Sequence, residues 1–157
     1  MTLLKSRIKK IKKAIVLNMI SWYPPYWGTG ICVKREGPEK LDFHVSMRHR
    51  FYNTNYVGVH FGGSLYSMAD PFFMLILMEK LGAGYLVWDK SATIHFKKPG
   101  TGLVSTIFRI DEEQVCQIRD IVEREQKYEP VFIAEIKNEK GVVVAIIEKT
   151  LWVKKKP

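Results

Sequence analysis

The chain combines segments in which apolar side chains recur at every second residue with one segment that is apolar throughout. Leu41, Phe43, Val45 and Met47 alternate with polar residues, which is the period of a half-buried strand. Strand character also marks five further ranges, separated by turn residues: 31–35, 85–98, 103–110, 128–137 and 142–153. We therefore expect six strands, with the acidic range 111–125 as a short helix or a wide connection.

Residues 62–81 form the most apolar stretch and predict a long helix that ends near Gly82 and Gly84. A helix that is apolar nearly all round must be buried on most of its faces. Two strands, one buried helix and four more strands predict an α+β domain whose antiparallel sheet wraps around the helix. Such a sheet leaves an edge strand, and pairing of edges between subunits is one way to protect it.

The first 25 residues predict a basic amphipathic helix that belongs to the same unit as the domain of residues 26–157. Its apolar side chains recur at spacings of three or four, with lysines between them: Leu4, Ile8, Ile11, Ile15, Met19 and Trp22. This helix packs its apolar side on the domain, or it lies on an anionic membrane surface or near the phosphates of coenzyme A. The uncharged stretch 14–20 is too short to span a bilayer and leads into bulky residues, so a cleavable signal peptide is not expected.

Composition narrows the class of protein. The length of 157 residues fits one domain, and 46% apolar with 26% charged residues is typical of a soluble globular protein. The net charge of +9 comes from nine basic residues at the two ends: Lys5, Arg7, Lys9, Lys10, Lys12, Lys13, Lys154, Lys155 and Lys156. The remainder holds 16 basic and 16 acidic residues, so no nucleic-acid surface is indicated.

The two cysteines and the four histidines do not have the spacing of metal ligands. We interpret Cys32 and Cys116 as free thiols in a reducing compartment, and expect a cytoplasmic protein. No glycine pattern for nucleotide phosphates occurs either. We therefore expect no metal and no cofactor, apart from coenzyme A carried by a substrate.

The range 53–70 carries the strongest chemical pattern. Here a polar loop leads to Gly62 and Gly63 at the start of the predicted helix. Two glycines allow a ligand carbonyl to approach the backbone, and the helix N-terminus offers unsatisfied N–H groups with partial positive charge. This combination suits the oxyanion of an attacked thioester, although a tight turn with close packing explains the same glycines.

Asp70 is harder to explain as a structural residue. A carboxylate in the middle of an apolar helix is costly unless it has a partner, and such a group suits a general base for water. Asp70 followed by Pro71 also fits a helix start after a break, with Asp70 as the N-cap. Both interpretations stay open on the residues alone.

With these residues in place, the window resembles the hotdog thioesterase superfamily, in particular its phenylacetyl-CoA thioesterase-like branch and a related thioesterase group of unassigned function. Members carry an Asn, then His-Gly-Gly, then an acid seven residues later; Asn55, Gly62, Gly63 and Asp70 stand at the matching places. His60 stands one position early, with Phe61 where the family has histidine. The likeness in fold covers about residues 30–153.

The resemblance implies an α+β hotdog fold and a site formed between two subunits of a dimer or a dimer of dimers. It implies that the Gly63 amide polarises the thioester carbonyl and that Asp70 acts as base or nucleophile, with Asn55 or His60 assisting orientation. The segment 91–100 looks like the family's strand near coenzyme A. The substrate-binding residues expected from the loop, the helix and this strand are Gly62, Ser64, Tyr66, Phe73, Thr93, His95 and Lys97.

The expected activity is hydrolysis of an acyl-CoA with a medium, long or aryl acyl group. A non-catalytic acyl-CoA or lipid-binding protein is the main alternative. A hydratase or dehydratase would use His60 and Asp70 as its acid and base pair. A protein that acts at a membrane surface would depend on residues 1–22.

Overall fold

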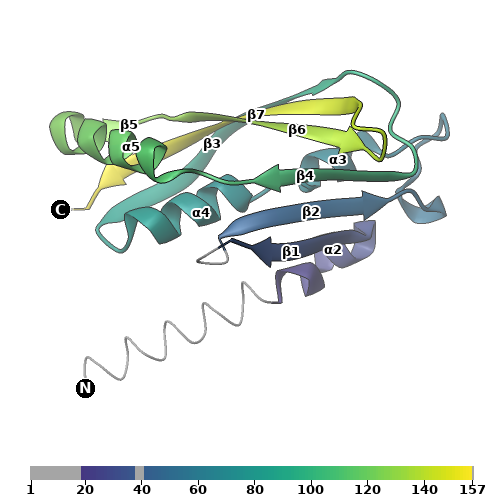
Figure 1. The fold of residues 1–157 in the computed structure, drawn as a ribbon, viewed down its shortest axis with the longest axis horizontal. Helices are drawn as coiled ribbons and strands as arrows, with labels where there is room; N and C mark the ends of the chain where they lie inside the picture. The colour runs from purple at the N-terminus through teal and green to yellow at the C-terminus, as the bar shows by residue number, and fades with distance from the viewer. Residues whose placement is uncertain (1–18, 38–40, 157) are drawn as a thin grey trace.

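The computed structural model describes residues 19–37 and 41–156 (Figure 1). Most of the predicted N-terminal helix lies outside these residues. The described part is built on an antiparallel sheet of seven strands in the order β1-β2-β4-β6-β7-β3, with β5 paired to β7. The strands are β1 (Ile31–Glu36), β2 (Asp42–Arg48), β3 (Tyr85–Phe96), β4 (Leu103–Phe108), β5 (Lys127–Tyr128), β6 (Val131–Asn138) and β7 (Val143–Lys155).

The helices lie before, between and after these strands. They are the 3-10 segments η1 (Ile20–Trp22) and η2 (Phe51–Asn53) and the α-helices α2 (Pro24–Thr29), α3 (Gly62–Ser67), α4 (Phe72–Leu81) and α5 (Glu112–Glu125). The sheet wraps around α3 and α4, which confirms the predicted hotdog fold (Figure 1). No helix of the described part is long and apolar enough to cross a membrane.

The predicted helix of residues 62–81 is confirmed with one interruption, at residues 68–71 between α3 and α4. Pro71 explains the break, because proline has no N–H to donate and its ring clashes with the preceding turn of a helix. A second difference is α2, a short helix that the sequence pattern did not predict. Pro24 and Pro25 open this helix and Gly30, with φ 74°, ends it, so these residues serve as helix boundaries.

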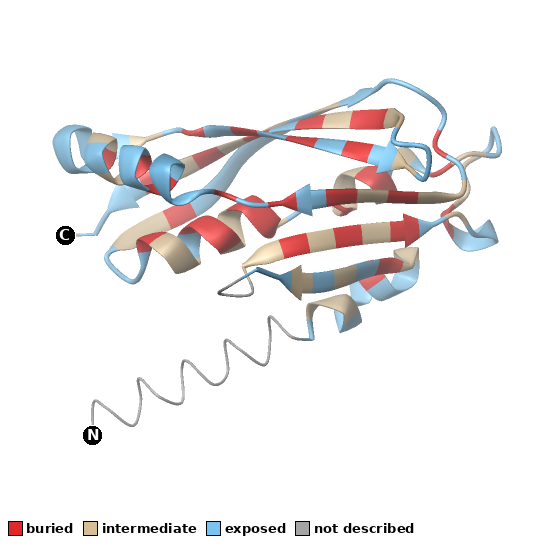
Figure 2. Cartoon of the chain, viewed as in Figure 1, coloured by how far each residue is buried: buried red, intermediate tan, exposed pale blue. Residues whose placement is uncertain are grey.

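Two phenylalanines at the start of α4 hold the helix to the sheet. Phe72 packs on Phe43 of β2 and Phe108 of β4, with ring centroids 5.1 and 5.0 Å apart. Phe73 stacks on Phe132 of β6 at 4.9 Å. Figure 2 shows the matching alternation of buried and more exposed residues along β2 and β6. The core therefore lies between α4 and three neighbouring strands.

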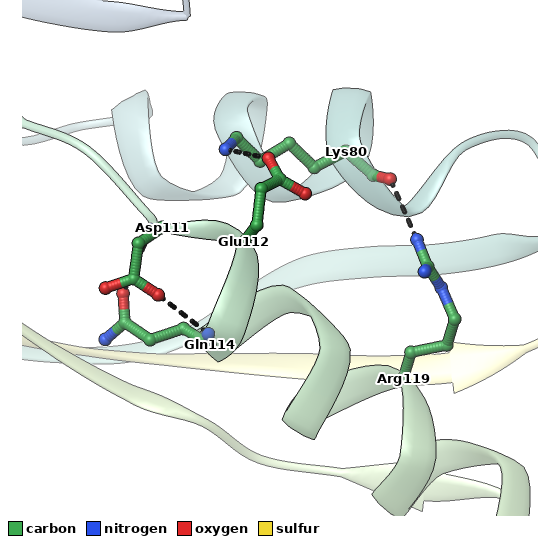
Figure 3. A network of polar contacts seen from close by, with 5 residues as sticks. All are labelled: Lys80, Asp111, Glu112, Gln114 and Arg119. Atoms are coloured by element: carbon green, nitrogen blue, oxygen red, sulfur yellow. Dashed lines mark hydrogen bonds and ion pairs between the residues drawn. The ribbon is translucent and has the colours of Figure 1, made fainter.

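The acidic range 111–125 forms α5, which is tied to the end of α4. Asp111 caps the helix, with its Oδ1 accepting from the Gln114 amide at 2.7 Å. Lys80 of α4 donates to Glu112 at 2.5 Å, and Arg119 donates to the Lys80 carbonyl at 3.2 Å (Figure 3). These contacts place α5 over one end of the sheet and keep it away from the corner between β3 and α3.

Replacing Phe72 by alanine tests the importance of this packing. Phe72 is fully buried, so Phe72→Ala should lower the free energy of unfolding by about 3–5 kcal/mol, measured by equilibrium urea denaturation. Phe51→Ala is the matched control, because Phe51 is 91% exposed, and we expect a change within about 0.5 kcal/mol. Equal effects of the two substitutions would contradict the assignment of the core.

Candidate active site

The corner at Gly62 and Gly63 is where the polar loop enters α3. The amides of Ser64 and Leu65 both donate to the Phe61 carbonyl, at 3.0 and 3.1 Å, so the amides of the two glycines lie ahead of the first hydrogen-bonded turn. A Cβ atom on Gly62 would lie only 2.8 Å from the ring of Phe96 at the end of β3. A side chain at position 62 would therefore displace the exposed ring of Phe96.

A cavity of about 540 Å³ opens beside this corner, and we call it the glycine cavity. It brings together four of the predicted site residues, Asn55, His60, Gly62 and Lys97. The rest of its lining is Val59, Phe61, Leu65, Phe96, Lys98, Pro99 and Gly100. Its floor is apolar, and two lysines of the segment after β3 stand at its edge.

His60 is held as a neutral imidazole in this cavity. Its side chain is buried, and its Nε2 lies 3.1 Å from the Gly102 carbonyl. A carbonyl only accepts, so Nε2 carries the hydrogen and the unpartnered, buried Nδ1 is an acceptor. Burial lowers the pKa of His60; the bond to Gly102 opposes this effect and the ring of His49, 4.8 Å away, adds to it. Its Nδ1 is therefore a buried acceptor with no partner among the described residues.

The two asparagines of the loop have different tasks. Asn55 Oδ1 accepts from the amides of Val57 and Val59, both at 3.1 Å, and so shapes the loop itself. Asn53, which sequence analysis passed over, is buried, and its side chain bonds the backbone of Arg50, Arg48 and Thr29. Nothing in the local sequence tells which asparagine faces inward.

A second cavity, of about 720 Å³, lies between the N-terminal end of the described chain and the α3–α4 connection. We call it the aromatic cavity. It contains two of the predicted residues, Tyr66 and Asp70. The other lining residues are Met19, Ile20, Trp22, Tyr23, Pro25, Tyr26, Ser67, Pro71, Met74, Leu75 and Asp89. Asp70 and Asp89 are the acidic groups in an otherwise largely apolar wall.

Asp70 lies in the connection between α3 and α4, so its expected place in mid-helix was wrong. The alternative of an N-cap is also wrong, because Pro71 holds that position and no side chain caps α4. The carboxylate is 49% exposed and its Oδ1 accepts from Lys149 Nζ at 2.7 Å. The Asp70 backbone carbonyl accepts from the hydroxyl of Tyr26. Asp70 is therefore stabilised by its ion pair with Lys149 and does not cap a helix.

Lys149 joins a second acid to the first. Its Nζ lies 3.2 Å from Asp89 Oδ2 and 5.7 Å from the centre of the Tyr66 ring, and its side chain is 2% exposed. Burial alone would lower the pKa of Lys149, but the hydrogen bond and charge of Asp70, together with Asp89, raise it above the ordinary value. Lys149 is therefore a permanent cation at neutral pH.

Burial and the charges of the Asp70–Lys149 ion pair also shift the pKa values of two neighbouring groups, Asp89 and Tyr26. Burial raises the pKa of Asp89; the charge of Lys149 opposes that rise and Asp70 adds to it. Burial also raises the pKa of Tyr26 well above its ordinary range, with the charge of Asp70 as the next cause and Tyr23 as the last. Tyr26 therefore stays protonated and keeps donating to the backbone of the α3–α4 connection.

Sequence analysis missed Lys149, although β7 contains a feature that reveals it. Lys149 occupies the buried phase of this strand, which is otherwise apolar: Ala145, Ile147, Leu151 and Val153. A lysine in that phase must have an acidic partner nearby. Asp70, an acid in an apolar segment, likewise indicates an oppositely charged partner, and the two residues pair with each other.

The remaining predicted residues are not part of the lining of either cavity. Gly63 follows Gly62 at the start of α3 but does not line the glycine cavity. Ser64 is a buried residue of α3, and Phe73 belongs to the core. Thr93 and His95 lie on the exposed side of the edge strand β3. His60 and Asp70 line different cavities, so one chain does not form the pair that a hydratase would need. Within the described ranges, no group of three or more His, Cys, Asp or Glu side chains could hold a metal ion.

A family model described as a domain of unknown function, DUF4442, matches residues 12–153 of the sequence. The chain belongs to the DUF4442 family. No curated protein matches this family member. The description of this family names no activity.

Several solved structures share the fold of this DUF4442 protein. A Pseudomonas aeruginosa protein of unknown function, named a probable thioesterase, has a TM-score of 0.72 at 19% identity, over 83% of this chain and 87% of its own. A Chlorobaculum tepidum protein of unknown function has a TM-score of 0.70 at 16% identity, over 94% and 96%. The E. coli PaaI protein of the phenylacetic acid degradation operon has a TM-score of 0.54 at 19% identity, over 82% and 81%. These likenesses confirm the predicted hotdog thioesterase resemblance at the level of fold.

The lowered pKa of His60 predicts how the stability of this DUF4442 protein depends on pH. The unfolded chain binds a proton at this histidine near pH 6.5, whereas the folded protein binds it only at lower pH. The free energy of unfolding should therefore fall as the pH drops from about 7 to about 5. We expect His60→Gln to lose less stability over this range in urea titrations. His95→Gln is the control, and the same pH dependence in all three proteins would contradict the assignment.

Proposed function

We propose that this protein hydrolyses an acyl thioester, such as an acyl-CoA, at a site completed by two copies of the chain. The observation that carries the proposal is an Asp70 carboxylate in the wall of the aromatic cavity, together with a glycine corner beside a second cavity of the same chain. A hotdog fold shared with proteins named as thioesterases supports the same reaction class.

Both cavities of one chain meet the edge strand β3. Asp89, in the first half of the strand, lines the aromatic cavity, and Phe96, its last residue, lines the glycine cavity. Seven steps along the strand place Asp89 and Phe96 roughly 23 Å apart. Antiparallel pairing of β3 with the same strand of a second copy would bring the aromatic cavity of one protomer beside the glycine cavity of its partner. Trp88 and Phe96, exposed on this edge, support such contact.

The chemistry follows from the two kinds of group. The Asp70 carboxylate takes a proton from water, and the hydroxide so formed attacks the thioester carbonyl. The negative oxygen of the tetrahedral intermediate accepts from the Gly63 amide of the other protomer. When the intermediate collapses, the C–S bond breaks and the sulfur leaves with the bonding pair. It takes the proton held by Asp70, which restores the carboxylate, and a carboxylic acid is released. His60 and Asn55 orient the glycine loop.

The lining of the aromatic cavity supports an apolar acyl group. Tyr66, Met74 and Leu75 form its wall together with the aromatic residues of η1 and α2. A volume of about 720 Å³ accommodates a medium or long acyl chain, or an aryl acyl group. Lys97 and Lys98, exposed at the edge of the glycine cavity, suit the phosphates of coenzyme A, which enters as part of the substrate.

Removing the charge of Asp70 tests the hydrolysis. We expect native protein to release free thiol from acyl-CoA, and Asp70→Asn to lower kcat by about 100-fold or more, because the amide cannot accept the proton of water. Acyl-CoAs with short, long and aryl acyl groups are compared in the same assay. Asp120→Asn, an exposed acid of α5, should match the native rate.

A native protein that binds a non-hydrolysable acyl-CoA analogue and releases no thiol from any acyl-CoA would overturn the proposal. It would favour the non-catalytic binding protein instead. Circular dichroism and thermal melting of each variant show that loss of turnover does not reflect loss of fold.

Mixing two inactive variants tests the shared site. Asp70→Asn removes the base, and Gly63→Pro removes the amide hydrogen at the glycine corner. A dimer with one protomer of each kind contains one site with both groups intact, so random mixing should restore about a quarter of native activity. Each variant alone should stay inactive. Failure of the mixture, with subunit exchange verified by mass spectrometry, would place the whole site in one chain.

A further inference from the structure

Lys149 carries a charge at a place where the fold offers it no water. Its side chain is 2% exposed, and its ammonium group lies between Asp70 Oδ1 at 2.7 Å and Asp89 Oδ2 at 3.2 Å. A buried ammonium group is costly unless its hydrogens are bonded to acids. These contacts tie β7 to the α3–α4 connection and to β3, three segments far apart in the sequence.

The backbone explains how Asp89 reaches this lysine. Strands β3 and β7 are paired in antiparallel register, with a shift between Asp89 and Ser91. The extra residue at this shift is Lys90, whose side chain turns outward to pair with Glu129 at 2.5 Å. A bulge of this kind changes the direction of the side chains beside it. Asp89 therefore shares Lys149 with Asp70, while the neighbouring lysine remains in solvent.

We propose that Lys149 is a positioning residue for Asp70, and that Asp89 is the second acid that holds Lys149 in place. Lys149 does not line the aromatic cavity, so it acts through Asp70 and does not touch substrate. Its contact at 2.7 Å fixes the carboxylate at the cavity wall, beside a positive charge. This inference rests on the proposed role of Asp70 as the base for water.

The charges that face Asp70 come from every element around it. Lys149 of β7 places a positive charge 2.7 Å from Asp70, and Asp89 of β3 is a like charge that binds the same ammonium group. Tyr66 of α3 contributes its ring to the ammonium group, and Tyr26 of α2, which stays protonated, bonds only the backbone carbonyl. Tyr23 lines the same cavity. Within the described part of the chain, Asp70 therefore faces one cation and one like charge that share a single contact.

Two substitutions should shift the pH dependence of hydrolysis in opposite directions. Lys149→Met removes the cation, so the acidic limb of the kcat/KM profile should move to higher pH. Asp89→Asn removes the like charge and leaves Lys149 to Asp70 alone, so the limb should move down. Lys90→Met is the matched control, because it removes a solvent-exposed cation of the same region, and its limb should coincide with that of the native protein.

A measurement without turnover separates this inference from the proposed function. The carboxyl carbon of Asp70, identified by its absence in Asp70→Asn, is followed by ¹³C NMR during a pH titration of native protein and of each variant. Its titration should move to higher pH in Lys149→Met and to lower pH in Asp89→Asn. If Lys149→Met does not fold, Asp89→Asn and Lys90→Met carry the comparison.

Each outcome decides one of the two claims. Acidic limbs and NMR titrations that match the native protein in both folded variants would overturn the role of Lys149. A native protein that releases no thiol, with Asp70 titrations that shift as expected, would reject the hydrolysis and retain the control of Asp70 by Lys149.

Discussion

The packing of α4 against the sheet is the contact on which the rest of the molecule depends. Phe72 and Phe73 meet aromatic rings from three neighbouring strands, so the start of the helix has one position relative to the sheet. The residues just before Phe72 cannot continue into the same apolar surroundings, because they include a carboxylate and a proline. The chain leaves the helix there, and Asp70 reaches the wall of a cavity. Core packing thus decides where the acid lies.

The ion pair of Asp70 and Lys149 shows how the fold admits charge beside a hydrophobic core. Replacing a buried pair by apolar residues is often neutral for stability, so the pair alone is weak evidence that it stabilises the protein. Its geometry is more informative, since one ammonium group joins two acids from different elements at the border of a cavity. The two acids satisfy two of the three hydrogens of the buried ammonium group.

The edge strand β3 links the two halves of the candidate site. It packs on the glycine corner through Phe96, its last residue, and contributes Asp89 from its first half to the contacts of Lys149. The same strand has a free edge in the described part of the chain. One element therefore supports both cavities and offers the surface on which a second copy would place them side by side. The proposed oligomer and the proposed chemistry depend on the same strand.

The sequence alone determined the strands, the apolar helical segment and the glycine corner, because each follows from periodicity or spacing within a few residues. It predicted Asp70 as the unusual acid, and four site residues that share one cavity. It did not determine the partner of Asp70, which lies 79 residues away on β7. Nor did it separate Phe73, which fills the core, from Tyr66, which lines a cavity. Contacts between distant segments depend on strand order, register and the bulge in β3, and only the tertiary structure decides these.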